Sequence, residues 1–458
     1  MQYISTRGNA PVLGFCDVLL AGLARDGGLY VPEIWPTLDK TPNANYANRA
    51  ASIMAPFVGN EIDVKVFNQL CIDAYSTFRH PDVAPLVEIS PNEYLLELFH
   101  GPTLAFKDIA LQLVGKLFDH VLKQRNERVM IVGATSGDTG GAAFDGVASC
   151  RNVDIVMLYP NNRVSDVQRR QMTTVMSPNV HAVAIDGTFD DCQDLVKAMF
   201  NDEKFRDANN LSAVNSINWV RVMAQVVYYV TALEKLGHSA VFSVPTGNFG
   251  NVLAGWIAKQ MGAQIDGFVV ASNTNDILTR FFESQQMIAN EVVPTLSPSM
   301  DIQVSSNFER LLFEMNSRDG AATAKQLKDF RMSGKLNVAP STFTNWIASV
   351  FTGYRCDDKQ TLTTMKDVYQ KSGMLIDPHT AVGLSAARQS KGANYSKSQS
   401  IITLATAHPA KFPDAVRRAT GQTPVLPEHL ADLMSRPERI ISLPNDLQAV
   451  QTFVAGCR

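Results

Sequence analysis

The feature that most constrains this chain is a repeated alternation of short apolar runs with helix-like segments. Each run is rich in Val, Ile, Leu or Ala and ends in Gly, Ser, Thr or Asn, as strands do where they meet loops. Strands of this kind are usually buried on both faces of a parallel sheet, so helices must cover both sides. The alternation predicts an α/β fold with doubly wound, mostly parallel sheets. The predicted strands are 128–132, 153–158, 180–185, 240–244, 267–271 and 400–404.

A chain of 458 residues has room for more than one domain. Residues 1–80 contain no clear strand followed by a glycine loop, so we expect a separate N-terminal domain there. Residues 81–235 and 236–458 are expected to form two subdomains. The second should carry a mostly helical insertion at about 290–370, as a lid or outer layer, and a surface tail after Pro424.

Charge and cysteine usage exclude several classes of function. The net charge is -3 and no basic stripe is interleaved with aromatic residues, which argues against nucleic acid. The six cysteines form no CxxC pair, so neither a zinc nor a redox motif is supported. We see no signal peptide and no apolar run of membrane-spanning length. We expect a cytoplasmic protein, monomeric or homodimeric, that acts on a small molecule without metal or membrane.

One lysine stands in an unusually apolar setting. Lys107 ends the run Leu104-Ala105-Phe106-Lys107, which follows the turn Gly101-Pro102-Thr103. A lysine beside apolar side chains loses hydration, which lowers its pKa and frees the amine for Schiff-base chemistry. Most lysines are solvated surface charges. Lys107 is therefore a candidate reactive group only in combination with other features.

A glycine loop far along the chain has the form of a phosphate cradle. The predicted strand 240–244 leads into Gly247-Asn248-Phe249-Gly250-Asn251 and then into a predicted helix over 252–261. Unpaired amides and the positive end of a helix favour a phosphate dianion. The loop lacks both the Gly-Lys-Ser/Thr ending of an ATP-binding loop and the GxGxxG pattern. The glycines also fit a purely structural turn.

A second strand-to-helix loop, at 133–141, carries Thr135, Ser136, Asp138 and Thr139. Hydroxyls and accessible amides suit a carboxylate or a phosphate. Many turns of this kind use Ser, Thr and Gly only for capping, so this signal is the weaker of the two.

A third loop follows the predicted strand 400–404 and delivers Thr406 to the rim of the sheet, where ligands bind in open α/β folds. The Thr406 hydroxyl can hydrogen-bond an aromatic nitrogen or cap the next turn. A reactive lysine, a cradle for one phosphate and this hydroxyl are together the parts that hold pyridoxal 5'-phosphate.

These residues lie in motifs by which the chain resembles the threonine synthase family of fold-type II pyridoxal-phosphate enzymes. The resemblance runs over nearly the whole length. The segment Asp26-Gly27-Gly28-Leu29-Tyr30-Val31-Pro32 is the most selective part, because dehydratases and cysteine synthases usually lack it. The other matching segments are 3–8, 100–108, 133–141, 187–192, 215–219, 247–251 and 377–381.

The resemblance implies roles for the candidate residues. Lys107 would carry the cofactor as a Schiff base and act as the general base, Thr406 would face the pyridine nitrogen, and the cofactor phosphate would be bound by Gly247, Asn248, Phe249, Gly250 and Asn251. The implied substrate is O-phospho-L-homoserine, which is converted with water to L-threonine and phosphate by γ-elimination and β-addition of water. This lyase reaction is the last step of threonine biosynthesis.

The substrate would bring a second phosphate, which requires a second anion site with charge-assisted donors. The candidates are Thr103, Thr135, Ser136, Thr139 and a cation from Arg163 or Arg221. Two alternatives remain open. The chain could be another fold-type II lyase, such as a threonine or serine dehydratase, or a non-catalytic binding protein that resembles threonine synthase.

Overall fold

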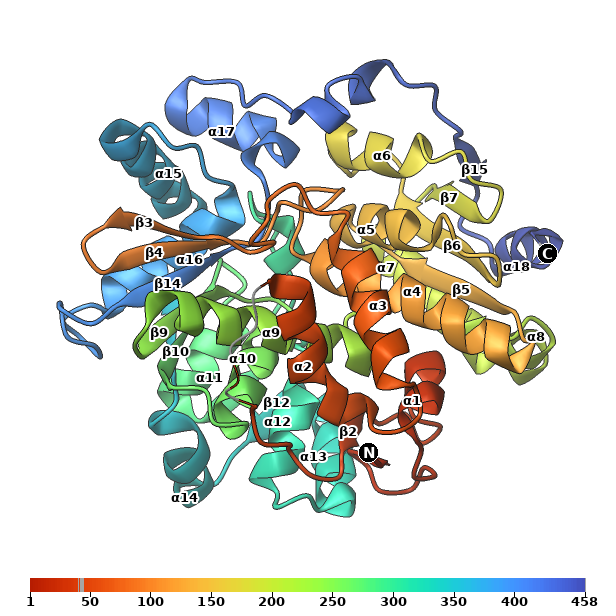
Figure 1. The fold of residues 1–458 in the computed structure, drawn as a ribbon, viewed down its shortest axis with the longest axis horizontal. Coiled ribbons are helices and arrows are strands. Elements are labelled where there is room, and N and C mark those ends of the chain that lie inside the picture. The colour runs from red at the N-terminus through yellow and green to blue at the C-terminus, as the bar shows by residue number, and fades with distance from the viewer. Residues whose placement is uncertain (40, 42–44, 458) are drawn as a thin grey trace.

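The computed structural model describes residues 1–39, 41 and 45–457, and it contains two large sheets (Figure 1). The smaller sheet has the order β15-β7-β6-β5-β8, and all its neighbouring strands are parallel. Its strands are β5 (Val129–Ala134), β6 (Val153–Pro160), β7 (Val180–Ile185), β8 (Leu211–Ser212) and β15 (Ile441–Leu443).

The larger sheet has the order β13-β10-β9-β14-β4-β3. Its neighbours are parallel except for the antiparallel pair β3 and β4 at one edge. Its strands are β3 (Leu86–Ser90), β4 (Glu93–Glu97), β9 (Ala240–Pro245), β10 (Ile265–Ser272), β13 (Phe351–Arg355) and β14 (Ile401–Ala405). The prediction of doubly wound, mostly parallel sheets is confirmed.

Helices cover both faces of each sheet, which explains why the strands are apolar without alternation. In the smaller sheet Ile131 packs with α4 (Lys107–Arg125) and α5 (Asp138–Val147), whereas Val132 packs with α7 (Phe189–Asn201) and α18 (Leu447–Gly456). In the larger sheet Val270 belongs to the cluster of α9 (Trp219–Leu236) and α10 (Gly250–Gln260). Its neighbour Val269 packs with α16 (Pro378–Ser390) on the opposite face.

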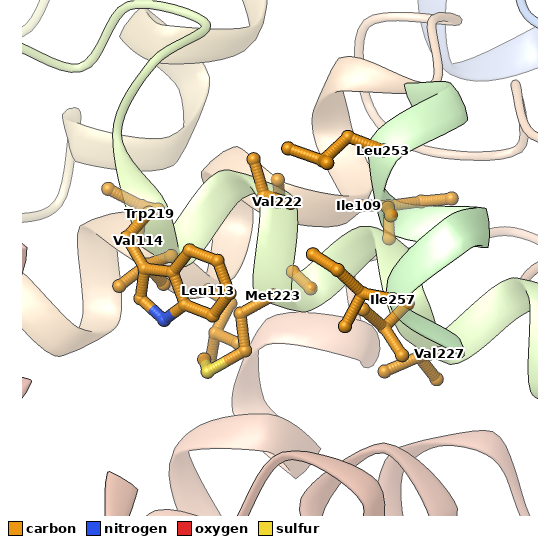
Figure 2. Packing of buried hydrophobic residues seen from close by; sticks show 14 of the residues in the cluster. Ile109, Leu113, Val114, Trp219, Val222, Met223, Val227, Leu253 and Ile257 are labelled. Carbon is orange, nitrogen blue, oxygen red and sulfur yellow. The ribbon is translucent and has the colours of Figure 1, made fainter. Parts of the chain in front are cut away.

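Helices α4, α9 and α10 share one hydrophobic core between the sheets. Figure 2 shows Ile109 of α4, Val222 of α9 and Leu253 of α10 gathered in this core. All three side chains are essentially inaccessible to solvent. Burial of each stabilises the fold by about 1.5–3 kcal/mol relative to exposure. Because each of these residues lies in the first turns of its helix, the core holds the N-terminal ends of the three helices in fixed relation.

The N-terminal segment packs into this same core. The hairpin of β1 (Tyr3–Ser5) and β2 (Tyr30–Pro32) and the helices α1 (Phe15–Ala21), α2 (Tyr46–Val58) and α3 (Val64–Tyr75) contribute side chains to the cluster of α4 and α9. Helix α2 lies against α9, and α3 lies against α4. The domain boundary near residue 80 stays a prediction.

The later part of the chain differs from expectation in two places. The stretch 290–370 is not only a helical insertion, because β13 joins the edge of the larger sheet. The chain after Pro424 is not only a surface tail, since β15 and α18 join the smaller sheet. Both strands are short edge strands without a long apolar run, and Gly353 interrupts β13, so they lack the sequence pattern of the buried strands.

The remaining helices surround these sheets: α6 (Asp166–Thr173), α8 (Glu203–Ala208), α11 (Ile277–Ser284), α12 (Phe308–Met315), α13 (Gly320–Ser333), α14 (Pro340–Phe343), α15 (Asp358–Ser372) and α17 (Pro413–Thr420). A small antiparallel pair is formed by β11 (Gln286–Ile288) and β12 (Lys335–Asn337). In the part of the chain that is described, no helix is long and apolar enough to cross a membrane. All six cysteines are free thiols, and five of them are buried.

Candidate active site

Lys107 is brought next to the end of β14 by backbone pairing. The Phe106 amide donates to the Thr406 carbonyl at 2.9 Å, and Ala105 forms an antiparallel bridge with Ala407. Leu104 takes a left-handed conformation with φ 63°, which turns the chain from this bridge toward α4. Lys107 is the first residue of α4, so Thr406 lies beside the segment that presents the lysine.

The Lys107 side chain is nearly buried, with 11% of its surface exposed. Its Nζ donates to Asp138 Oδ2 at 3.3 Å, its single hydrogen bond to the described residues. Burial lowers the pKa of Lys107; the Asp138 carboxylate opposes that shift, whereas the Lys411 and Arg221 charges add to it. The expectation of a desolvated lysine with a depressed pKa agrees with this environment.

The β9–α10 junction, residues 246–251, has backbone amides without acceptors. The amides of Gly247, Asn248, Phe249, Gly250 and Asn251 donate no hydrogen bond to any described residue. Helix α10 begins at Gly250, so its first amides have no partner within the helix. Phe249 has a left-handed backbone with φ 61°, which curls the chain at the helix start. Such a group of amides at a helix N-terminus favours an anion.

The carbonyl groups of this junction are held by the segment that precedes α12. Ser305 Oγ donates to the Gly247 carbonyl at 2.6 Å, and the Asn307 amide donates to the Asn248 carbonyl at 3.1 Å. Asn251 Oδ1 accepts from the hydroxyl of Tyr229 at 2.9 Å, whereas its Nδ2 is buried without a partner. An unpaired buried donor is costly, so this junction has the character of a site for an acceptor ligand.

The β5–α5 junction, residues 134–141, uses its amides differently. Thr135 Oγ1 accepts from the amides of Gly137 and Gly140, each at 2.9 Å. The Thr135 hydroxyl therefore organises the loop. Ser136 and Thr139 are partly exposed, and their hydroxyls make no hydrogen bond within the described residues, so these two groups are free for a ligand.

Asp138 at the start of α5 lies between two lysines. Its Oδ1 is 2.9 Å from Lys411 Nζ, and its Oδ2 is 3.3 Å from Lys107 Nζ. Burial raises the pKa of Asp138, but the charges of Lys411 and Lys107 outweigh burial and hold it well below the usual range. Gly137 precedes Asp138 with φ 127°, and a Cβ there would lie 2.7 Å from the Gln168 side chain. The glycine is therefore required for this approach.

The two candidate arginines are placed very differently. Arg163 lies exposed in the loop after β6, and the charge near it is Asp191. Arg221 in the first turn of α9 is buried, donates from Nη1 to the Val214 carbonyl at 3.1 Å, and leaves Nε without a partner. Burial lowers the pKa of Arg221 to about 10. A buried cation without a carboxylate partner is the stronger candidate for an anion ligand.

Thr103 and Thr406 complete the predicted set. The Thr103 hydroxyl donates to Asp108 Oδ1 at 2.5 Å, and its amide donates to Asp108 Oδ2 at 2.8 Å, so the side chain holds the start of α4. Burial raises the pKa of Asp108 to about 7, against these hydrogen bonds. Thr406 is buried at the end of β14, and its hydroxyl is unbonded to the residues that the structure describes.

Sequence reasoning assigned no role to either Lys411 or Asp138. Ser299, whose Oγ lies 3.4 Å from Asp138 Oδ2, was missed. A signal for Lys411 existed, because it lies in the third strand-end loop, five residues after the candidate Thr406. No group of three or more His, Cys, Asp and Glu side chains that suits a metal is found in residues 1–39, 41 and 45–457.

The arrangement can bind an anionic cofactor beside a reactive amine. Ser299 links the β9–α10 junction to this site, because its Oγ lies 3.4 Å from Asp138 Oδ2 and a Cβ on Gly247 would lie 2.6 Å from its carbonyl oxygen. The charges that act on Lys107 are the carboxylate of Asp138 and the cations of Lys411 and Arg221. The surplus of positive charge favours phosphate groups, and burial keeps water from the amine.

Comparison with known proteins places the chain among enzymes of one kind. Residues 83–407 match the family described as pyridoxal-phosphate dependent enzyme. Residues 2–75 match the threonine synthase N terminus, and residues 380–454 match threonine synthase, C-terminal.

Individual relatives agree over their whole length. The threonine synthase of Pseudomonas aeruginosa is 53% identical over 464 residues, covering 99% of this chain and 98% of that protein. A crystal structure of pyridoxal-phosphate-bound threonine synthase from Brucella melitensis superimposes with a TM-score of 0.96 at 50% identity, over 100% of this chain and 99% of that chain. The crystal structure of threonine synthase from yeast superimposes with a TM-score of 0.93 at 38% identity, and the match covers 100% of this chain and 98% of that chain.

Proposed function

The chain belongs to the threonine synthase family of pyridoxal-phosphate-dependent enzymes, and from that premise we propose that it converts O-phospho-L-homoserine and water into L-threonine and phosphate. The observation that carries this proposal is the nearly buried amine of Lys107, bonded to Asp138, together with two sets of unpaired anion donors, because cofactor and substrate each bring a phosphate. Ser299 links Asp138 to the first set, the β9–α10 junction, and the charge of Arg221 in the second set acts on Lys107. The enzyme is a lyase of threonine biosynthesis, and we place it in the cytoplasm.

The residues present fit the cofactor. We assign its phosphate to the amides of Gly247, Asn248, Phe249, Gly250 and Asn251, which have no acceptor of their own. Lys107 would carry it covalently, and the free hydroxyl of Thr406 would meet the ring nitrogen. When bound, pyridoxal 5'-phosphate supplies an electron sink for negative charge at the substrate carbons. A threonine is a neutral partner, so this contact would leave the ring nitrogen largely unprotonated.

Lys107 is the proposed general base and acid. Its Nζ, with a pKa lowered chiefly by burial, would take the α-proton of the substrate and return a proton at the end of the reaction. The nearly buried position limits the water that reaches the reacting carbons, while one water is needed for addition at the β-carbon.

The substrate phosphate is assigned to Arg221 together with Ser136 and Thr139. Arg221 has an unpaired Nε, and the two hydroxyls make no hydrogen bond within the described part of the chain. The earlier candidates Thr103 and Thr135 act in this proposal by shaping the site, since their hydroxyls already bond Asp108 and the Gly137 and Gly140 amides. Arg163 is exposed and is left out of this assignment.

The test is product analysis with O-phospho-L-homoserine and the cofactor-loaded protein. We expect phosphate and L-threonine in equal amounts from the wild type. Lys107→Ala should lower the rate by at least about 10³-fold, because it removes both the covalent anchor and the base. Lys359→Ala, an exposed lysine of α15, is the matched control and should be unaffected.

Other products would favour the alternatives. Formation of a 2-oxo acid and ammonia from threonine or serine, without reaction of O-phospho-L-homoserine, would identify a dehydratase. Binding of O-phospho-L-homoserine without any turnover would identify a non-catalytic protein.

A further inference from the structure

One carboxylate, that of Asp138, is shared by two buried lysines that come from distant parts of the chain. Lys107 begins α4, whereas Lys411 ends the short 3₁₀ helix η3 (Pro409–Lys411). The two ammonium groups contact different oxygens, Lys411 at Oδ1 and Lys107 at Oδ2. The two lysines are therefore not interchangeable in their relation to Asp138.

The Lys411 ammonium is held by the chain itself. It donates to the Thr103 carbonyl at 2.8 Å and to Gln171 Oε1 at 2.9 Å. Its Nζ also forms an ion pair with Asp138 Oδ1 at 2.9 Å, and its side chain is 0% exposed. These contacts place Lys411 inside the fold. Its charge acts through Asp138.

The Lys107 ammonium is held far more loosely. Its single hydrogen bond within the described residues is the 3.3 Å contact with Asp138 Oδ2, and it lies 5.0 Å from the centre of the Phe106 ring. Asp138, by contrast, is fixed, because Gln168 Nε2 donates to Oδ1 at 2.9 Å alongside Lys411. Oδ1 is thus anchored by Gln168 and Lys411, whereas Oδ2 accepts from Lys107 at 3.3 Å and from Ser299 Oγ at 3.4 Å.

We propose that Asp138 and Lys411 are positioning residues for Lys107: Lys411 anchors one oxygen of the Asp138 carboxylate so that the other receives the Lys107 amine whenever that amine is free. This inference rests on the proposed function of Lys107. It adds two residues that act on the reactive amine without touching the substrate phosphate.

Asp138 and Lys411 shift the pKa of Lys107 in opposite directions. The charged groups that face Lys107 are Asp138 on α5, Lys411 on η3 and Arg221 on α9, and His379 on α16 also faces Asp138. Removing the Asp138 charge leaves Lys107 among cations, which lowers its pKa. Removing the Lys411 charge takes away a repelling cation and leaves Asp138 to Lys107 alone, which raises the pKa of Lys107. We therefore expect the two substitutions to change the pKa of Lys107 in opposite directions.

The test measures the titration of Lys107 in the full-length apoenzyme. Trace acetic anhydride labels amines only in their neutral form, and mass spectrometry measures the labelling of Lys107 from about pH 6 to about pH 11. Exposed Lys359 serves as the reference inside each molecule. We expect the midpoint of Lys107 to fall in Asp138→Asn and to rise in Lys411→Gln, each by about one pH unit, which is about tenfold in neutral amine. Lys411→Arg should stay close to wild type.

Two results would overturn the proposal. Unchanged midpoints in both variants would show that neither residue acts on Lys107. A midpoint that rises in Asp138→Asn would show that Asp138 maintains the structure around Lys107 and does not stabilise its positive charge. If Lys411→Gln fails to fold, Asp138→Asn still decides, because a merely structural role raises the midpoint and the proposal lowers it. Failure of the proposed reaction is separate: it appears as absent threonine from the wild type, whatever the labelling.

Discussion

The β5–α5 and β9–α10 junctions look alike in sequence but differ in whether their backbone amides have acceptors within the protein. Both follow a buried strand, contain glycines and open a helix. In the β5–α5 junction Thr135 accepts two of the loop's own amides, whereas the β9–α10 junction leaves five consecutive amides without an acceptor. The Thr135 hydroxyl therefore uses two amides of its own loop that the β9–α10 junction would leave for a ligand.

The same contrast separates two buried arginines. Arg310 donates to the carbonyls of Tyr30 and Ile217 and to Asn307 Oδ1, so its guanidinium is used inside the fold. Arg221 donates a single hydrogen bond to the described residues, and its Nε is unpaired. Free donors indicate ligand binding, and saturated donors indicate architecture.

The largest effect is expected from Gly247→Ala, which tests whether the free amides of the β9–α10 junction bind the cofactor. The added Cβ would lie 2.6 Å from the Ser299 carbonyl oxygen, so the backbone must shift and the row of amides with it. We expect the affinity of the apoenzyme for pyridoxal 5'-phosphate, measured by fluorescence titration, to fall at least about 100-fold. Gly456→Ala, where nothing lies within 4 Å of the new atom, is the control. Wild-type affinity in Gly247→Ala would remove the β9–α10 junction from the cofactor site.

The arginine pair should separate binding from stability. Arg221→Met is expected to raise the KM for O-phospho-L-homoserine about 10- to 100-fold, the loss of a charge-assisted hydrogen bond, while unfolding in urea changes by about 1 kcal/mol or less. Arg310→Met should instead lose about 3 kcal/mol of stability, because three acceptors lose their donor. Equal destabilisation by both substitutions would contradict the distinction.

The smallest effect on binding is expected in the β5–α5 junction. Thr135→Val leaves the amides of Gly137 and Gly140 without an acceptor, so the free energy of unfolding should fall by about 2 kcal/mol or more. Thr135→Ser keeps the hydroxyl acceptor and should retain most of the wild-type free energy of unfolding. Ser136→Ala removes a hydroxyl without a partner and should stay within about 0.5 kcal/mol. A large rise in KM for Thr135→Val at unchanged stability would make Thr135 a substrate ligand after all.

The central strands could be predicted from the sequence because burial on both faces requires a continuous run of apolar residues. The strand Val180–Ile185 lies between two helical layers, so all its positions except His181 are apolar and its limits could be predicted. The β3 and β4 strands were not predicted, since β3 at the sheet edge has no buried residue and both strands carry glutamates. The roles of Lys107 and the β9–α10 junction stay predictions; the sequence suggested them because the residues involved are neighbours along the chain.

The contacts around Asp138 were out of reach for a different physical reason. The bond from Lys411 to Asp138 depends on how the turn at η3 packs against α5 and α6, and no periodicity records it. Likewise Arg163 and Arg221 are equivalent as residues, and burial alone distinguishes them. Long-range packing decides which charges meet.

Strand β14 is synthesised late but pairs with two strands, β4 and β9, that are synthesised much earlier. Residues 93–97 leave the ribosome long before residues 401–405, which pair with them. At about 5–20 residues per second, the edges of β4 and β9 wait roughly 15–60 s and 8–32 s respectively for their partner. During that time Phe106 has no Thr406 to pair with, and two strand edges stand open to other chains. The larger sheet is thus completed by a late strand, and translation past residue 405 sets the moment at which β4 and β9 can be joined through β14.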